Sequence, residues 1–513
     1  MENFGCRTNQ SDGDSIAAAM ECLGAEPAPS QDADVVVVNT CSVTAEAERE
    51  ARAYIRRAQR LSPGARVVVT GCYAQRASQE IAALDGVYAV VENSQKHRAA
   101  EVSLRQAFPA QVLKTPDLVP LTSITGMPVQ PGEMAGASPL VIGSETFAHT
   151  DILLPSFPAS VMQRMQTGAG NRTRPSLKIQ DGCGNRCTFC IIPETRGNSR
   201  SLPPKQVLHA VQEFIAAGGQ ELVLTGINLG RWGRDLAPQS RFEDLLSEIF
   251  ETTALTRLRI SSVEPMDWTD RMNALLRRWG TGTHPRLARH VHLPLQSGSD
   301  AILRKMHRRY RPWHYAERLA SVRSASPEAA IGADVMVGFP GETDRLFQES
   351  LDFISAQPFT YLHLFPFSAR PGTPGRELHR RQPVPGEAVK ARMSALRSLI
   401  EEKNLAFRAS SVHRALSVLT LILNGEKPQQ TAALSDNFIP VEVEGAWPPN
   451  TLLTTRIFGV SEHGLQGSMP PESLAQRSTV QPAQHPSSLL GANPKCYTHE
   501  ASRSLAHLEA AHR

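Results

Sequence analysis

The stretch that decides the fold is residues 177–190, Leu-Lys-Ile-Gln-Asp-Gly-Cys-Gly-Asn-Arg-Cys-Thr-Phe-Cys. A short strand over its first four residues leads directly into a C-x₃-C-x₂-C run made of Cys183, Cys187 and Cys190. Structural zinc takes four ligands, and the nearest histidines, His149 and His209, lack a ligand-like spacing. A [4Fe–4S] cluster held by three thiolates fits the run better, because it leaves one iron open to a further ligand.

Strand and helix signals alternate downstream of this run for more than 200 residues. Six β/α units in series predict a parallel barrel, and six falls short of the eight of a closed barrel. We therefore predict a partial (β/α)₆ barrel over residues 174–411. Its expected strands are Leu177–Gln180, Glu221–Thr225, Arg257–Ser261, His290–Leu293, Gly332–Val337 and Tyr361–Phe365, and its expected helices include Pro203–Ala217, Phe242–Glu251, Thr343–Ala356 and Glu387–Ala409.

Residues 1–104 show the same alternation on a smaller scale. Valine-rich runs at 35–38, 66–70 and 87–91 are typical of strands buried on both faces of a parallel sheet. The segments 44–61 and 75–84 between them favour helices. This pattern predicts a small doubly wound α/β domain.

The other segments have different compositions. Residues 105–173 hold eight prolines between Pro109 and Pro158, and we interpret them as a linker or insertion. Short β runs at 415–423, 440–443 and 451–460 predict a small all-β module over residues 412–467. Residues 468–513, rich in Pro, Ser, Ala, Gln and His, are predicted to be disordered.

Length and composition exclude several classes of protein. The chain has 513 residues, 41% of them hydrophobic and 20% charged, which suits a globular protein of several domains. No run approaches the about 18 apolar residues of a membrane helix, the start lacks a secretory signal, and eight cysteines are too few for a disulfide scaffold. We expect a cytoplasmic protein without a membrane partner, in which clustered cysteines bind metal.

Three further cysteines follow predicted strands of the N-terminal domain. Cys41 and Cys72 come just after the valine runs, and Cys6 follows Gly5 at the exit of a possible first strand. The carboxyl ends of parallel strands meet at one sheet edge, where ligands bind. Three thiols at this edge predict a second set of cluster ligands, although three buried small side chains remain an alternative.

Taken together, these motifs resemble the radical S-adenosylmethionine (SAM) methylthiotransferase family. The C-x₃-C-x₂-C run looks like the radical SAM signature, and the order of domains matches, with the β module similar to a TRAM domain. Local stretches agree: Phe-Gly-Cys6-Arg-Thr-Asn, Asn-Thr-Cys41-Ser-Val-Thr, Thr-Gly-Cys72-Tyr-Ala-Gln, His292-Leu-Pro-Leu-Gln-Ser-Gly-Ser and Gly338-Phe-Pro-Gly-Glu-Thr. The resemblance covers residues 1–104 and 174–467; the linker is longer than usual and the module has only three Lys or Arg.

The resemblance implies two [4Fe–4S] clusters and SAM as both radical source and methyl donor. Cys183, Cys187 and Cys190 would hold the cluster that cleaves SAM, and Cys6, Cys41 and Cys72 a second cluster that carries sulfur. Candidate SAM contacts are Phe189, Gly218, Gly219, Glu221, Ser262 and Glu264. Core packing is the alternative for Phe189, and helix termination is the alternative for the two glycines.

The resemblance also implies the substrate class. Family branches attach a methylthio group to N6-threonylcarbamoyladenosine or N6-isopentenyladenosine at position 37 of tRNA, or to an aspartate of a ribosomal protein. Leu224-Thr-Gly-Ile-Asn-Leu-Gly230, together with Ile179–Cys183 and Ser261–Pro265, looks most like the threonylcarbamoyladenosine branch. The isopentenyl branch tends to carry Gly-Gln-Asn where this chain reads Gly226-Ile-Asn.

Local charge favours an RNA partner over a protein. Residues 286–414 contain 20 Lys and Arg against 12 Asp and Glu, and phosphate neutralisation drives RNA binding. The expected contacts with the tRNA anticodon stem-loop are the β module and a basic segment made of Arg304, Lys305, Arg308, Arg309 and Arg311, for which a solvated surface is the alternative. An electron donor and a sulfur donor complete the expected partners.

Two further expectations concern function and the chain's start. An iron–sulfur protein that binds RNA or carries electrons without SAM chemistry is the competing class, although electron carriers usually fill all four cluster corners with protein ligands. Only Met1 to Phe4 precede Gly5, whereas a buried strand usually needs about five residues. We expect either coding sequence upstream or a stub as first strand.

Overall fold

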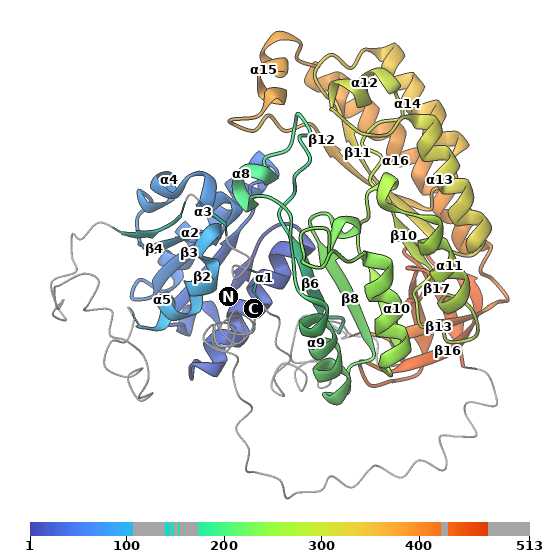
Figure 1. The fold of residues 1–513 in the computed structure, drawn as a ribbon, viewed down its shortest axis with the longest axis horizontal. Coiled ribbons are helices and arrows are strands. Elements are labelled where there is room, and N and C mark those ends of the chain that lie inside the picture. The colour runs from blue at the N-terminus through green and yellow to red at the C-terminus, as the bar shows by residue number, and fades with distance from the viewer. Residues whose placement is uncertain (106–138, 145, 148–151, 154–172, 422–428, 470–513) are drawn as a thin grey trace, which may run out of the picture. The chain divides into compact units, whose positions relative to one another are not determined.

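The computed structural model describes residues 1–105, 139–144, 146–147, 152–153, 173–421 and 429–469 (Figure 1). The chain divides into two compact units. Of the described residues, the first unit holds those up to 153 and the segment 191–198, and the second holds 173–190 and 199–469. Most of the predicted linker, and the predicted disordered tail apart from its first two residues, lie outside the described residues.

The first unit contains a five-stranded parallel sheet whose strand order follows the chain. Its strands are β1 (Glu2–Asn3), β2 (Val35–Thr40), β3 (Arg66–Gly71), β4 (Val87–Glu92) and β5 (Leu140–Ile142). β1 has only two residues. β5 corrects our interpretation of residues 105–173, because part of that segment completes the sheet by pairing with β4.

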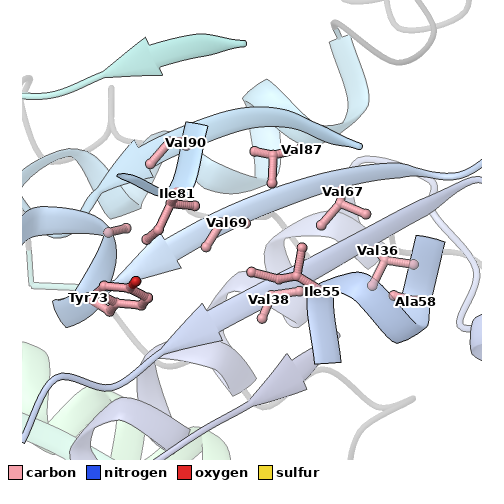
Figure 2. Close-up of a cluster of buried hydrophobic side chains, with 11 residues drawn as sticks. Val36, Val38, Ile55, Ala58, Val67, Val69, Tyr73, Ile81, Val87 and Val90 are labelled. Carbon is pink, nitrogen blue, oxygen red and sulfur yellow. The ribbon is translucent and has the colours of Figure 1, made fainter. Parts of the chain in front are cut away.

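Helices cover both faces of this sheet, which explains its unbroken valine runs. Alternate residues such as Val36 and Val38 pack against Ile55 and Tyr73 on one face (Figure 2). Val37 and its counterparts pack against α1 and α5 on the other face. The helices are α1 (Arg7–Cys22), α2 (Ala45–Leu61), α3 (Cys72–Arg76), α4 (Ser78–Ala82) and α5 (Ala99–Arg105), with the single helix expected at 75–84 replaced by α3 and α4.

The second unit begins with the predicted partial barrel. Its six parallel strands are β6 (Ser176–Asp181), β8 (Glu221–Gly226), β9 (Arg257–Ile260), β10 (His290–His292), β11 (Ala330–Val337) and β12 (Tyr361–Pro366), with the short β7 (Arg200–Ser201) antiparallel to β6. They form sheets β7-β6-β8-β9 and β10-β11-β12, joined by a bridge between Ser262 and His292. Because no ladder joins β6 to β12 among the described residues, the barrel is open, as predicted.

Helices between the strands pack on the outside of the barrel (Figure 1). Their bounds are α9 (Pro204–Ala216), α10 (Phe242–Thr252), α11 (Asp270–Trp279), α12 (Asp300–Lys305), α13 (Pro312–Ala325) and α14 (Asp344–Ala356). After the last barrel strand come α15 (Pro374–Arg381) and α16 (Gly386–Ala409). α8 (Ile192–Arg196) belongs instead to the first unit, although it follows β6 in the chain.

A closed five-stranded barrel follows α16 in the second unit. Its order is β13 (Ala415–Thr420), β14 (Gln430–Ser435), β15 (Pro440–Glu444), β17 (Leu465–Ser468) and β16 (Leu452–Val460). The sequence predicted three of these strands but not β14 and β17, and Ser468 ends β17 rather than starting the tail. Among the described residues, no helix is both long and apolar enough to cross a bilayer.

Candidate cluster-binding sites

The three N-terminal cysteines end three neighbouring strands, as predicted. Cys41 and Cys72 directly follow β2 and β3, whose last residues Thr40 and Gly71 are paired in register. Cys6 follows β1 and precedes the first residue of α1. All three are free thiols; Cys41 and Cys72 are buried and Cys6 is exposed.

Two glycines allow the backbone to approach this edge closely. Gly5 has a φ of +89°, and a Cβ there would lie 2.4 Å from the Cys41 sulfur. Gly71 has a φ of +98°, and a Cβ there would lie 2.3 Å from the Thr40 carbonyl oxygen. Because L side chains avoid this backbone region and no space exists for one, both positions require glycine.

A fully buried arginine donates to one of these cysteines. Arg196 Nε lies 3.1 Å from Cys72 Sγ, Nη1 lies 3.0 Å from Asp12 Oδ2, and Nη2 lies 3.0 Å from Asn9 Oδ1. Lys96 Nζ also pairs with Asp12 at 3.1 Å, and the side chains of all three charged residues are at most 2% exposed. The cysteine edge is therefore lined by two cations that share one carboxylate.

Burial and nearby thiols raise the pKa of Cys41 and of Cys72, which keeps these two thiols protonated in the absence of metal. Burial, and then Cys6 and Cys72, raise the pKa of Cys41 to about 12. Burial also raises the pKa of Cys72, against the opposing effect of Arg196. Metal binding deprotonates thiols, and arginine stabilises the resulting thiolate, so this donor set suits an anionic cluster.

The donor set also bears on the kind of metal group that these sites suit. No group of three or more His, Cys, Asp or Glu side chains among the described residues is placed to hold a single metal ion. A four-iron cluster is larger than an ion and its thiolates stand further apart. Three thiols without an additional histidine or carboxylate ligand fit such a cluster better than zinc.

In the second unit, the C-x₃-C-x₂-C run lies at the carboxyl end of β6. The turn after β6 is held by Gln180, whose Nε2 donates to the carbonyl oxygens of Asp181 and Gly182 at 3.0 and 2.7 Å. Cys183 Sγ accepts from the Asn185 backbone N–H at 3.4 Å, and Asn228 Nδ2 lies 3.6 Å from the same sulfur. All three cysteines of the run are free thiols.

Asn228 follows β8, so it reaches Cys183 from the neighbouring strand. Its Oδ1 atom is buried and has no hydrogen-bond partner among the described residues, and the same holds for Gln296 Oε1 after β10. Unsatisfied buried acceptors are rare and need an explanation. They suit a polar ligand bound at the carboxyl end of the barrel.

A second buried arginine contacts this run. Arg308 Nη1 donates to Cys187 Sγ at 3.3 Å, and Nη2 pairs with Glu264 Oε2 at 2.6 Å. Burial raises the pKa of Cys187, and Arg308 opposes that shift. Glu264, predicted as a SAM contact, therefore lies beside the cysteine run.

These side chains border a cavity of about 280 Å³. Its lining carries four arginines and a histidine against one carboxylate, that of Glu264. The lining residues are Gly184, Asn185, Arg186, Cys187, Arg231, Glu264, His307, Arg308 and Arg309. The cavity therefore suits an anionic ligand.

Part of the predicted basic segment supports the cysteine run rather than RNA. Thr188 donates from its backbone N–H to Met306 O at 3.2 Å and from its hydroxyl to Lys305 O at 2.9 Å, so the segment anchors the cysteine run. Arg308 is buried against Cys187, and Arg311 donates to the Arg308 and Tyr310 carbonyl oxygens. These two are corrections to the RNA-contact prediction, because their guanidinium groups are engaged within the protein.

The other three basic side chains of the segment are exposed, namely Arg304, Lys305 and Arg309. Arg304 pairs with Asp300 at 2.8 Å, and Lys305 Nζ lies 3.5 Å from the Gly341 carbonyl oxygen. Arg309 lines the cavity. For these three residues, contact with RNA stays a prediction.

Phe189 and Ser262 lie at the predicted end of the barrel. Phe189 is partly buried against an apolar cluster that includes Met306, Phe339 and Phe365, so packing accounts for much of its surface. Ser262 bridges to His292 next to the carboxyl end of β9. Neither residue lines the cavity.

Gly218, Gly219 and Glu221 do not lie with the cysteine run. β8 runs parallel to β6 from Glu221 to Gly226, so these three residues lie at the opposite, amino end of the barrel. Gly218 has a φ of +82° and caps α9, while a Cβ on Gly219 would lie 2.0 Å from the Phe214 ring. The structure therefore corrects the predicted SAM contact and supports helix termination.

Glu221 instead forms the centre of a buried ion-pair network. Its carboxylate lies 2.8 Å from Arg259 Nε, 3.4 Å from Arg257 Nη1 and 3.4 Å from Arg174 Nη1. Burial alone would raise the pKa of Glu221, but Arg259 and its neighbours outweigh burial and lower the pKa to about 2. This role is structural.

Several residues of the two sites have roles that were not predicted, among them Asn228, Arg196 and Arg308. Asn228 was quoted in a motif but given no role, although its place just past a barrel strand was a usable signal. Arg196 carried no such signal, because its partners Asp12 and Asn9 are more than 180 positions away in the chain. Arg308 was assigned to RNA because its charge, rather than its burial, is visible in a sequence.

Two protein-family models match this chain. Residues 1–92 match "Uncharacterized protein family UPF0004", and residues 177–354 match "Radical SAM superfamily". The two matches include all six cysteines of the candidate sites.

Curated relatives match most of the chain. It is 32% identical over 446 residues to the threonylcarbamoyladenosine tRNA methylthiotransferase MtaB of Bacillus subtilis, covering 86% of this chain and 89% of the relative. The MtaB protein of Aquifex aeolicus is 31% identical, with coverages of 86% and 96%. The tRNA-2-methylthio-N(6)-dimethylallyladenosine synthase of Acidothermus cellulolyticus is 32% identical, with coverages of 85% and 80%. With its two domain matches and these similarities over nearly its full length, the chain belongs to the radical SAM methylthiotransferase family.

Proposed function

We propose that this enzyme attaches a methylthio group to N6-threonylcarbamoyladenosine at position 37 of tRNA in the cytoplasm, using two [4Fe–4S] clusters. The observation that carries the proposal is the pair of free-thiol triads, one at the carboxyl end of β6 and one at the carboxyl edge of the N-terminal sheet. When bound, the clusters and SAM supply the radical, the sulfur and the methyl group that an unactivated C–H position requires.

In the barrel, the residues of this chain bind and orient these groups. Cys183, Cys187 and Cys190 would hold the SAM-cleaving cluster. Asn228 and Gln296 offer buried carbonyl oxygens, which accept hydrogen bonds from a ligand's ammonium or hydroxyl group. Glu264 holds Arg308 against the Cys187 sulfur, so that the guanidinium stabilises the thiolate.

In the N-terminal domain, Cys6, Cys41 and Cys72 would hold the second cluster. Gly5 and Gly71 bring the strand ends close together, which limits the space available around the thiols. Arg196 and Lys96 supply positive charge to the buried side of the site. This positively charged environment supports an anionic cluster that is bound by three thiolates.

The cavity beside Cys187 supports an RNA substrate. Arg186, Arg231 and Arg309 line it, and phosphodiesters are recognised by arginines in such concave sites. A phosphate held there would place the neighbouring nucleoside close to the barrel opening. The two MtaB relatives are named as tRNA methylthiotransferases, which agrees with this substrate class.

Relatives named for either activity are equally similar to this chain, at 32% identity, so the choice of nucleoside rests on the sequence of this chain. Gly226-Ile-Asn228 favours threonylcarbamoyladenosine, and dimethylallyladenosine is the second candidate because of the Acidothermus relative. Mass spectrometry of tRNA nucleosides from cells with and without the gene tests both. Loss of the methylthio derivative of threonylcarbamoyladenosine supports the proposal, and loss of the dimethylallyl derivative alone refutes it.

A test of SAM chemistry separates this enzyme from a cluster protein that only binds RNA. Anaerobically reconstituted protein is mixed with SAM and a reductant, and 5′-deoxyadenosine is measured. We expect its formation to depend on Cys190. Intact clusters without 5′-deoxyadenosine would contradict the radical mechanism.

A further inference from the structure

Arg196 occupies an unusual place in the chain. It follows the last cysteine of the C-x₃-C-x₂-C run by six positions, yet its helix α8 packs within the N-terminal unit. There the Asn93 side chain donates to the Thr195 carbonyl oxygen at 2.8 Å, which fixes the end of α8. The Arg196 side chain has no exposed surface.

The Arg196 guanidinium satisfies three acceptors at once. Cys72 Sγ lies 3.1 Å from Nε, Asp12 Oδ2 lies 3.0 Å from Nη1, and Asn9 Oδ1 lies 3.0 Å from Nη2. Asp12 and Asn9 thereby hold the planar group with its Nε–H directed at the sulfur. A lysine is a compact point charge on a flexible stem and does not reproduce this fork.

Hydrogen bonds to the sulfurs, together with nearby charge, set the reduction potential of an iron–sulfur cluster. Reduction adds negative charge to the cluster, so a fixed cation that donates to a ligand sulfur favours the reduced state. The effect is strong where water is excluded, because the local dielectric constant is low. Arg196 donates to a ligand sulfur and is fully buried, so both statements apply to it.

We propose that Arg196 is a positioning residue that sets the reduction potential of the N-terminal cluster through its hydrogen bond to Cys72. The inference rests on the proposed function only in assuming that this cluster is present. The proposal also gives the cysteine run a second role. The pattern C-x₃-C-x₂-C-x₅-R carries the ligands of the barrel cluster and the residue that tunes the N-terminal cluster.

The experiment uses the full chain with Cys183, Cys187 and Cys190 all changed to Ala, so that the N-terminal cluster alone can form. After anaerobic reconstitution, iron is counted and the midpoint potential is measured by a redox titration followed by electron paramagnetic resonance. In this background, Arg196→Gln should bind the cluster but lower the ratio of reduced to oxidised cluster tenfold or more at a fixed potential. That change equals a midpoint about 59 mV more negative for a one-electron couple.

Two further variants separate tuning from general disturbance. Arg196→Lys keeps the charge without the fork and should give a smaller shift of the same sign. The Lys variant also tests the proposal if the Gln variant fails to fold. In both variants, Asp12 keeps its ion pair with Lys96. Arg52→Gln is the matched control, because Arg52 lies in the same domain and donates to the Tyr73 hydroxyl and Glu80; it should leave the potential unchanged.

The outcomes distinguish the two claims. Absence of iron from the parent triple-Ala protein would overturn the second cluster and hence the proposed function. A cluster that titrates at the same potential with and without Arg196 would overturn the inference and leave the proposed function intact. A shift in the Arg52 variant equal to that in the Arg196 variant would also overturn it.

Discussion

Glu221→Gln should weaken the amino end of the barrel rather than the binding of SAM. Glu221 is the carboxylate that faces Arg174, Arg257 and Arg259 at the start of β8 and β9. Arg259 also donates to the carbonyl oxygens of Ser435 and Asp436 in the C-terminal β module, at 3.1 and 3.2 Å. Glutamine keeps the shape and removes the charge, which leaves buried arginines without their shared counter-ion.

The size of the effect follows from two independent estimates. Removing one partner of a buried ion pair usually costs about 3–5 kcal/mol. The network lowers the pKa of Glu221 from 4.5 to about 2, and at 1.36 kcal/mol per pKa unit this difference corresponds to about 3 kcal/mol. We therefore expect local opening to become easier by about 3 kcal/mol, which is more than a hundredfold in an equilibrium constant.

Hydrogen exchange measured by mass spectrometry gives the required local resolution. Peptides that contain β8, β9 and β13 should exchange more than a hundredfold faster in the Glu221→Gln variant. Glu251→Gln is the matched control, because Glu251 pairs with Arg278 at 3.1 Å on the surface, where ion pairs contribute at most about 1 kcal/mol. Unchanged exchange in Glu221→Gln, accompanied by a loss of SAM affinity, would refute the structural role and restore the SAM contact.

Four further outcomes are expected. Cys190→Ala should abolish 5′-deoxyadenosine formation and methylthiolation together, whereas Cys72→Ala should keep SAM cleavage, hold about half the iron and lose methylthiolation. Iron, 5′-deoxyadenosine and modified nucleoside are measured in parallel for both variants. The reverse pattern would contradict the assignment of the two sites. Deletion of residues 412–469 should reduce thermal stability and soluble yield, because buried arginines of the barrel lose their partners in the β module. It should also reduce tRNA affinity. A barrel that stays equally stable would count against packing of the module on the barrel. The contribution of Glu221 to stability should be complete above pH 4.5 and lost as the pH falls from 4.5 towards 2, because its folded-state pKa is lowered to about 2. Acid denaturation of the Glu221→Gln variant should lack this loss of stability. Truncation after Met469 should preserve folding and cluster content, because β17 ends at Ser468, and loss of either would show that the tail is required.

The sequence predicted the barrel well because its strands are buried and strongly patterned. All six parallel strands were located within a few residues of their observed ends. The prediction was weaker where a segment is short or its partner is distant. β5 has three residues in a proline-rich segment, and its pairing with β4 is set by tertiary packing.

The candidate sites were predictable only in part, for a related reason. Cysteines that follow strands can be placed from strand signals alone, and the structure confirms that Cys6, Cys41 and Cys72 follow three adjacent strands. The residues that support them cannot be placed in this way. Arg196 and Arg308 contact the two sites only after distant parts of each unit have folded together.

The polarity of the strands explains the one clear error in the candidate SAM contacts. In parallel β/α structures the carboxyl ends of the strands carry the ligands, whereas residues at the amino ends serve stability. Gly218 and Gly219 precede β8 and Glu221 is its first residue, so the glycines end α9 and the carboxylate holds arginines that contact the β module. Asn228 follows the same strand and reaches the Cys183 sulfur. A motif of this barrel therefore has to be judged by the strand end at which it lies: the same glycine and acid residues that would bind a cofactor after β8 serve packing before it.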